Sequence, residues 1–485
     1  MALTNEPIIK KRKQVESVLL LRLRLAMLEG SFHPINFRPP YSLKYVESLL
    51  LQSRAASVRL IDQRITNLNF FDILGVFREI RYDLVVIDVS TLNSKESLKF
   101  CELIRGGKQN CKTVLIGIGQ EISANAQTYS TLGIFDILIA GEAEVEIFSI
   151  IERLNEGISI DEIKEYYKHH DRFGKELTVA DLDELPYPVY SREDFKGYSY
   201  VYPLKLSKRI VWGNVLSSRG CPNACIFCSQ ITRESYGKKL RLRSAVSVVD
   251  EIEYQHALGA NMIAFTDDNF TTSVLHVESI CREIKSRNLN IKWAAHARVD
   301  EVDRSLIRLM KDAGCILLRF GIESGSKRVV EFLGKTRNPD SWFLQSKEAV
   351  AQAKSLGISV ACLFIIGSPT ETSEDIRESV AFAKELSPDV IQVAYFTPFP
   401  GSQFYTRIKG GVDEQTISWM YHYNKPLINF SAMEDSELNN AQALFYKSFL
   451  LRPSFIFSHF RDHFLFYVFN PGIFRKLFGS IKKLG

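Results

Sequence analysis

Three cysteines stand close together in the segment "SSRGCPNACIFCSQ", residues 217–230. They are Cys221, Cys225 and Cys228, and thiolates at such short spacing are typical ligands of zinc or of an iron–sulfur cluster. The other five of the eight cysteines are scattered, and no further pair of Cys or His completes a four-ligand zinc site. An iron–sulfur cube held by three thiolates keeps one iron open for an outside ligand.

Two other interpretations compete with a cluster. The spacing would also place the three cysteines on one face of a helix, as a buried apolar stripe, and zinc remains an alternative metal. Gly220, Pro222 and Asn223 favour a loop over a helix interior. The sequence therefore predicts a cluster-binding loop.

Bulk composition limits the class of protein. The 485 residues are 46% hydrophobic and 24% charged, an ordinary globular balance that predicts two or three domains. A net charge of +5 gives no reason to propose nucleic acid as a partner. We find no signal peptide, no run of about 20 apolar residues and no disulfide framework, and we expect a cytoplasmic protein.

The first 155 residues alternate strand and helix patterns. Helical spacing occurs at 41–52, 94–105 and 143–154, between apolar runs at 17–23, 58–62, 84–89, 113–118 and 136–140. Short buried strands alternating with helices indicate a parallel sheet covered on both faces. Residues 1–155 are therefore predicted to form a flavodoxin-like, doubly wound domain.

The alternation resumes after a polar, proline-containing linker predicted at 156–205. Five helical segments separate strands expected at 210–216, 262–266, 291–295, 316–321, 358–366 and 390–396. The fold class is thus α/β throughout, with a partial (β/α)6 barrel over 206–410 and a helical extension over 411–485. In such barrels the chemistry lies at the carboxyl ends of the strands.

The cysteine motif, with Phe227 before its last cysteine, resembles the radical S-adenosylmethionine (SAM) superfamily. The resemblance implies a 4Fe–4S cluster whose open iron binds the amino and carboxylate groups of SAM. It also implies reductive cleavage of SAM to a 5′-deoxyadenosyl radical, which abstracts hydrogen from an unactivated C–H bond.

Segments after the later strands fit the same family in the same order: "FTDDNF", "AHARVD", "RFGIESGS", "IIGSPTET" and "FTPFPGSQFY". Solvated strand-end turns are the alternative for each of them. The resemblance implies SAM contacts near the methionine amino group, the ribose, the carboxylate and the adenine, and the candidates are Asp267, Asp268, Asn269, Arg298, Glu323, Ser324 and Gly367.

The first domain resembles that of the cobalamin-binding subfamily, which includes methyltransferases and anaerobic ring cyclases. The matches are "RPPYSLKYVESLL" (38–50), "DVSTLNS" (88–94) and "GEAEVEIF" (141–148). They imply cobalamin contacts from Ser90, Thr91, Gly117, Gly119, Gly141 and Glu142. "GIGQ" (117–120) stands where relatives have Gly-Gly-Pro-His, and His33 is the only histidine before residue 169. A domain that only supports the barrel is the alternative.

Residues 452–485 are dense in phenylalanine and end in basic residues. One interpretation is a helical lid that lines the substrate cavity. The other is an interfacial helix at 472–485 that contacts a membrane peripherally, which would favour a lipid substrate.

Together these patterns predict an anaerobic radical SAM enzyme that transfers a methyl group to carbon with cobalamin. The alternatives are a cyclase or other C–C bond-forming radical enzyme, and a non-catalytic iron–sulfur or cobalamin carrier. The expected partners are a small-molecule or lipid substrate and an electron donor such as flavodoxin or ferredoxin.

Overall fold

The computed structural model describes most of the chain, in two compact units. The described residues are 15–24, 39–54, 56–80, 82–91, 93–106, 113–169, 178–198, 210–228, 239–408, 426 and 428–469. Unit 1 comprises Met1–Leu25, Pro40–Val179 and Leu185–Val189, and unit 2 comprises Ala26–Pro39, Ala180–Glu184 and Tyr190–Gly485.

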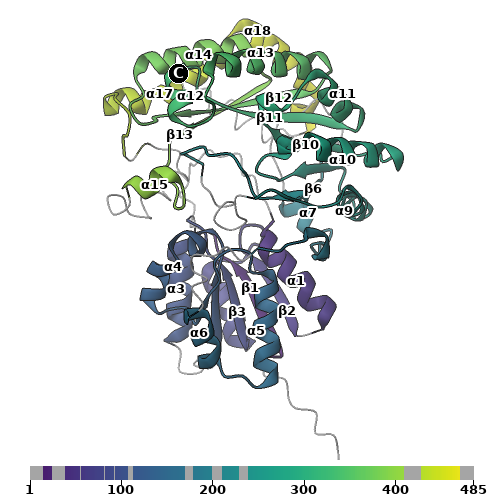
Figure 1. Cartoon of the computed structure of the whole chain (residues 1–485), viewed down its shortest axis with the longest axis vertical. Helices are drawn as coiled ribbons and strands as arrows, with labels where there is room; N and C mark the ends of the chain where they lie inside the picture. Colours follow the sequence, from purple (N-terminus) through teal and green to yellow (C-terminus); the bar gives the residue numbers. More distant parts are fainter. Residues whose placement is uncertain are drawn as a thin grey trace, which may run out of the picture. The chain divides into compact units, whose positions relative to one another are not determined.

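Unit 1 contains a five-stranded parallel sheet of order β2-β1-β3-β4-β5, the order of flavodoxin-like folds (Figure 1). The strands are β1 (Ser17–Arg22), β2 (Ser57–Asp62), β3 (Leu84–Asp88), β4 (Val114–Ile118) and β5 (Ile137–Leu138). The helices are α1 (Tyr41–Ser53), α2 (Phe70–Glu79), α3 (Ser94–Arg105), α4 (Gln120–Leu132), α5 (Glu144–Glu156) and α6 (Ile160–His169).

Both faces of this first sheet are buried. Leu20 and Val86 belong to one hydrophobic cluster, whereas their chain neighbours Leu19 and Val85 belong to another. Because successive strand residues point to opposite faces, the strands need apolar residues at every position, as their sequences have. The predicted linker 156–205 contains α6, whose Ile163 and Tyr167 pack into the core of unit 1.

Unit 2 contains a six-stranded parallel sheet of order β13-β12-β11-β10-β9-β6. Its strands are β6 (Trp212–Val215), β9 (Met262–Phe265), β10 (Lys292–Ala297), β11 (Cys315–Glu323), β12 (Ser359–Ile366) and β13 (Val390–Tyr395). The connecting helices are α9 (Ala245–Ala257), α10 (Val274–Ser286), α11 (Arg304–Asp312), α13 (Pro339–Ser355) and α14 (Ser373–Leu386). Neighbouring strands follow chain order, so all six carboxyl ends meet at one edge. The parallel α/β class is confirmed, while closure into a barrel stays a prediction.

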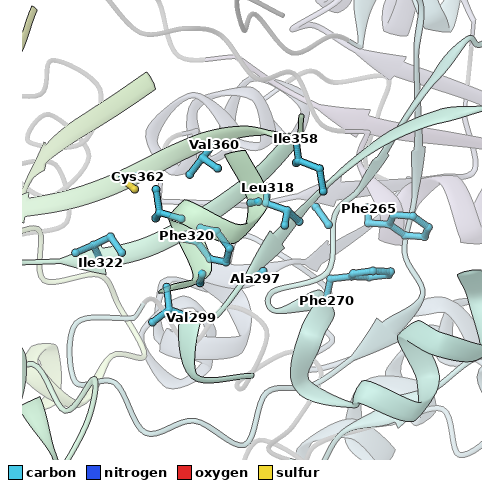
Figure 2. Close-up of a cluster of buried hydrophobic side chains, with 14 of the residues drawn as sticks. Phe265, Phe270, Ala297, Val299, Leu318, Phe320, Ile322, Ile358, Val360 and Cys362 are labelled. Atoms are coloured by element: carbon cyan, nitrogen blue, oxygen red, sulfur yellow. The ribbon is translucent and has the colours of Figure 1, made fainter. Parts of the chain in front are cut away.

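The two faces of this second sheet pack in different hydrophobic clusters. The face packed against the helices carries large residues such as Phe265, Leu318 and Phe320, which Figure 2 shows in one cluster. The opposite face mixes the small residues Ala264, Ala294 and Ala361 with the larger Trp212, Met262 and Leu317. A small hollow on that face is lined by Trp212, Ala264, Phe265, Ala294, Ala295, His296, Leu317 and Arg319.

The other described elements of unit 2 are several short elements and two long helices, α17 and α18. They are α7 (Asp194–Gly197), β7 (Ser218–Arg219), β8 (Arg241–Leu242), α12 (Lys327–Phe332), α15 (Gln403–Ile408), α17 (Asp435–Leu450) and α18 (Pro453–Phe469), with 3-10 turns at Leu182–Glu184, Phe270–Thr272 and Val299–Glu301. Within the described residues, no helix has the length and apolar character needed to cross a membrane. The interfacial helix predicted at 472–485 lies outside the described residues.

Candidate active site at the strand ends of unit 2

The loop that carries the cysteines starts from a fixed point. Asp267 is buried just after β9. Its carboxylate accepts hydrogen bonds from the backbone N–H of Ser217 (3.2 Å), from the hydroxyl of Ser217 (2.8 Å) and from the hydroxyl of Ser218. On the other side, the guanidinium of Arg243 donates to the carbonyl of Leu216 (3.0 Å). These bonds hold the chain between β6 and the first cysteine.

The far side of the same loop is also held by backbone bonds. The N–H of Ile226 donates to the carbonyl of Leu333 (3.1 Å), and the carbonyl of Ile226 accepts from the N–H of Phe404 (3.1 Å). Both partners lie in segments that follow later strands of the sheet. The loop and the residues that lead into it are therefore bonded to four separate segments of unit 2, at Arg243, Asp267, Leu333 and Phe404.

The three cysteines differ in exposure: Cys221 is half-buried, Cys225 buried and Cys228 exposed. Burial raises the pKa of the Cys221 thiol, and the negative charges of Asp268 and Cys225 raise it further. In the described part of the chain, no three His, Cys, Asp or Glu side chains are already assembled around a metal position. The donor set nevertheless fits a 4Fe–4S cluster, because three thiols on a braced loop supply the soft ligands that iron–sulfur clusters take.

The three polar residues of "TDDN" have different surroundings, although the sequence groups them. Asp267 is used internally, as described. Asn269 is also buried: its amide donates to Glu301 (2.6 Å) and its carbonyl oxygen accepts from the Thr271 hydroxyl (3.0 Å). Only Asp268 is exposed, and its charge acts on Cys221. Of the three side chains, that of Asp268 is therefore the one that solvent reaches.

Arg298 lies at the end of β10, buried, with its guanidinium near the cysteine loop. It donates to both carboxylate oxygens of Asp300 (2.9 and 2.7 Å) and to the carbonyl of Lys335 (3.0 Å). Burial alone would lower its pKa, but the bonds and charge of Asp300, with the nearby Cys225, raise the pKa above its ordinary value. Arg298 is therefore a fixed positive charge beside the cysteines.

Glu323 ends β11 in a left-handed conformation (φ 72°), after a shift in the β11–β12 register. A non-glycine residue adopts this conformation at a cost of order 1–3 kcal/mol, so other contacts must hold it. Its carboxylate accepts from the Lys335 ammonium (2.8 Å), and both side chains are buried. Burial opposes the charged form of Lys335, but Glu323 and Cys225 outweigh it and raise the pKa of this lysine. The pair is a charged, preorganised contact at the sheet edge.

Ser324 and Gly367 have structural reasons of their own. The Ser324 hydroxyl is fully buried and bonds to the hydroxyl of Ser379 (2.9 Å), so it is directed into the unit and not toward the rim. Gly367 has φ 79°, and a Cβ there would lie 3.1 Å from Leu438 of α17. Its N–H donates to buried Glu371, as does that of Ser368 (3.0 Å).

Sequence reasoning missed two buried ionisable residues, Lys335 and Glu371. Lys335 follows a short helix twelve residues after Glu323, and nothing in "LGKTRNP" marks it as a partner of that glutamate. Glu371 belongs to the quoted segment "IIGSPTET", and burial raises its pKa to about 8. The sequence signal that could have identified Glu371 is an acidic residue a few positions after an apolar strand.

The cobalamin candidates of unit 1 are mostly occupied by internal contacts. The Thr91 hydroxyl donates to Glu121 (2.8 Å), and both residues are buried. Glu142 is buried and accepts from the N–H of Val179, and a Cβ on Gly117 would lie 3.0 Å from Leu138. Gly141 is also buried. Of the six candidates, the half-exposed ones are Ser90 and Gly119.

Known proteins resemble the chain along most of its length. Residues 215–383 match the family model of the Radical SAM superfamily. An uncharacterized methyltransferase of Pyrococcus horikoshii is 28% identical over 431 residues, covering 88% of this chain and 90% of the relative. Cytidylyl-2-hydroxyethylphosphonate methyltransferase of Streptomyces wedmorensis is 26% identical over 76% of this chain and 74% of its own. The anaerobic magnesium-protoporphyrin IX monomethyl ester cyclase of Rubrivivax gelatinosus is 28% identical over 58% of this chain and 49% of its own.

Solved structures match the fold of both units. The radical SAM methyltransferase TsrM from Kitasatospora setae, solved with cobalamin and a [4Fe–4S] cluster, superposes with a TM-score of 0.63 at 18% identity, over 81% of this chain and 74% of that one. The cobalamin-dependent radical SAM enzyme OxsB gives 0.60 at 17% identity, over 86% and 58%.

Residues 215–383 form a domain of the Radical SAM superfamily, and this domain defines the class of enzyme. The family prediction from the cysteine motif is thereby confirmed, and with it the 4Fe–4S cluster and SAM as the cofactors of the class.

Proposed function

We propose that the strand edge of unit 2 binds a 4Fe–4S cluster through Cys221, Cys225 and Cys228, with SAM beside it. The observation that supports this most strongly is that Arg298 and Lys335, both buried and positively charged, lie where they act on Cys225. Three deprotonated thiols in a partly buried loop need such compensation. When bound, the cluster and SAM supply a 5′-deoxyadenosyl radical that abstracts hydrogen from a C–H bond.

Each strand-end residue has a task that follows from its chemistry. Asp268 is an exposed carboxylate near Cys221, suited to the ammonium group of the methionine part of SAM. Glu323 is held by Lys335 in a fixed orientation, suited to accept hydrogen bonds from ribose hydroxyls. The backbone at Gly367 is the segment proposed to contact adenine, while the absence of a Cβ there makes room for Leu438 of α17. Asp267, Asn269 and Ser324 act in positioning these groups, which changes the ligand role that we predict for them from sequence.

We propose further that the enzyme is cobalamin-dependent and transfers a methyl group to carbon. The support is that two of the curated relatives described above are methyltransferases, and that both solved structures containing cobalamin match the fold of unit 1 together with unit 2. In unit 1, Ser90 and Gly119 are the candidates open to a large ligand. Cobalamin, when bound, supplies the methyl group.

A second candidate is C–C bond formation or ring closure without methyl transfer. It is favoured by the similarity to the anaerobic cyclase over 286 residues. Product mass separates the two: methyl transfer adds one CH2 to the substrate, whereas cyclisation removes hydrogen. The proposed partners are a small-molecule or lipid substrate and a reductant such as flavodoxin or ferredoxin, together with peripheral membrane contact by residues 472–485.

The test of the cobalamin proposal is anaerobic reconstitution with iron, sulfide and hydroxocobalamin, followed by desalting and a visible spectrum. We expect a corrin band in addition to the broad cluster absorption near ~400 nm. The cysteine variant Cys225→Ala should lose the cluster absorption and keep the corrin band, since the two sites are in different units. A spectrum with cluster and no corrin would overturn methyl transfer and leave the radical chemistry standing.

A further inference from the structure

Helix α18 exposes a row of large apolar side chains on the surface of unit 2. Phe457 is 71% exposed, Phe464 61%, Val468 54% and Ile456 42%. At roughly 100° per residue, these four side chains fall within an arc of about 120° on one side of the helix. We call them the α18 stripe.

The opposite side of α18 is attached to the core, so the exposure of the stripe does not come from a detached helix. Phe455 packs against the main hydrophobic cluster of unit 2, with its ring 4.9 Å from that of Phe449 on α17. The guanidinium of Arg452 lies over both rings. The helix, drawn in yellow in Figure 1, is therefore anchored on one side, and its large exposed side chains lie on the other.

The sequence of the C-terminal segment that contains the stripe is basic. Residues 451–485 contain six Lys or Arg and a single acidic residue, Asp462, together with eight of the 32 phenylalanines of the chain. Aromatic and aliphatic side chains flanked by basic residues are the composition of helices that lie in the headgroup region of anionic membranes.

Two other occupants of the stripe are disfavoured by the same charges. A second copy of the chain would bring an equally basic segment to the contact. Residues 470–485 carry Arg475, Lys476, Lys482 and Lys483 and no acidic residue, so they too would add positive charge. An anionic lipid surface is the occupant that complements both the apolar row and the charge.

We propose that the α18 stripe docks unit 2 on the surface of an anionic lipid membrane, with Phe457 and Phe464 inserted among the lipids and the basic residues at the headgroups. The prediction from sequence places the membrane contact at 472–485; the stripe adds a folded helix to it. The docking is independent of the reaction assigned to unit 2.

The experiment is co-sedimentation of the full chain, without added cofactors, with vesicles of phosphatidylcholine alone or with about 30 mol% phosphatidylglycerol. We expect binding to the anionic vesicles that weakens as salt is added. The double variant Phe457→Ser/Phe464→Ser should bind at least about tenfold more weakly, because each removed phenyl ring contributes a kcal/mol or more to insertion. Both residues are exposed, so the thermal midpoint should stay near that of the unaltered chain.

The matched control is Phe71→Ser/Leu275→Ser, which removes two side chains of comparable exposure, 73% and 76%, on α2 and α10. It should bind vesicles as the unaltered chain does. The proposal is overturned if the unaltered chain does not bind anionic vesicles, or if both double variants behave alike. It is also overturned if sedimentation velocity shows a dimer that only the α18 double variant loses. Because no cofactor is present, failure of the proposed reaction would leave this result unchanged.

Discussion

The two parallel sheets of this protein have the same kind of architecture and differ at their carboxyl edges. At the edge of the first sheet, Thr91, Glu121 and Asn125 form hydrogen bonds with one another and are buried. At the edge of the second, Asp268 is exposed and Glu323 carries a charge held by a buried lysine.

The comparison shows what turns a strand edge into a ligand site. Buried polar groups normally form hydrogen bonds with each other. A strand edge in which all of them do so stabilises the fold and leaves no polar group for a ligand. An edge in which charged groups are fixed by neighbours and still face outward is preorganised for a ligand. In the described residues, unit 1 shows mainly the first pattern. Unit 2 instead combines a buried, paired carboxylate, Glu323 with Lys335, with one exposed carboxylate, Asp268.

The largest effect should come from the cysteine loop. We expect Cys225→Ala to lower production of 5′-deoxyadenosine from SAM and dithionite by at least about 100-fold, because a cluster ligand is lost. Cys101→Ala, a buried cysteine of unit 1, is the matched control and should retain production. Equal loss in both variants would show that the effect is one of folding.

The second-largest effect should come from substitutions in the Glu323–Lys335 pair. Lys335→Met leaves a buried carboxylate without its partner and should cost about 3 kcal/mol in free energy of unfolding, with a loss of SAM affinity. Adding Glu323→Leu should restore most of the stability and none of the SAM binding. Urea unfolding and equilibrium dialysis of SAM measure the two quantities. If the double variant binds SAM normally, the pair has no part in the site.

Substitutions of the two neighbouring aspartates, Asp267 and Asp268, should affect different properties of the protein. Asp267→Asn weakens three hydrogen bonds to Ser217 and Ser218, and we expect it to lower the free energy of unfolding by about 1–3 kcal/mol. Asp268→Asn is exposed and should leave stability within about 0.5 kcal/mol while weakening SAM binding. The opposite pattern would exchange the roles given to these two residues.

In unit 1, Thr91→Val removes the hydroxyl that donates a hydrogen bond to Glu121. We expect this to lower the free energy of unfolding by about 1–2 kcal/mol. Corrin retained after desalting should be unchanged, since Thr91 is buried. Loss of corrin at unchanged stability would instead make Thr91 a cofactor contact and reduce the contrast between the two edges.

The last prediction concerns the pH dependence of stability. Burial raises the pKa of Glu371 to about 8, well above the value of an exposed glutamate. A raised carboxyl pKa means that the folded state favours the protonated form, so its contribution to stability is complete below about pH 4.5 and is lost as the pH rises toward 8. Glu371→Gln should flatten the fall of the thermal midpoint over that window. An unchanged slope would place its origin elsewhere.

The sequence predicts the strands of unit 2 well because each is a short apolar run followed at once by polar residues; the run 358–366 corresponds to β12. It does not predict α4, whose residues "QEISANAQTYSTL" have little apolar periodicity. Nor can it separate Asp267 from Asp268, since adjacent residues of one type differ only in which neighbour they face. Lys335 is found only when the chain is folded, because its partner lies on another element.

The most direct test of the central claim is an electron paramagnetic resonance spectrum of the reduced, reconstituted protein, recorded before and after SAM is added. A cluster held by Cys221, Cys225 and Cys228 has one open iron, so the account predicts that SAM changes the cluster signal. The same change should be absent in the variant Asp268→Asn at SAM concentrations that saturate the unaltered chain. A cluster signal that is identical with and without SAM would contradict the claim that this strand edge binds the two together.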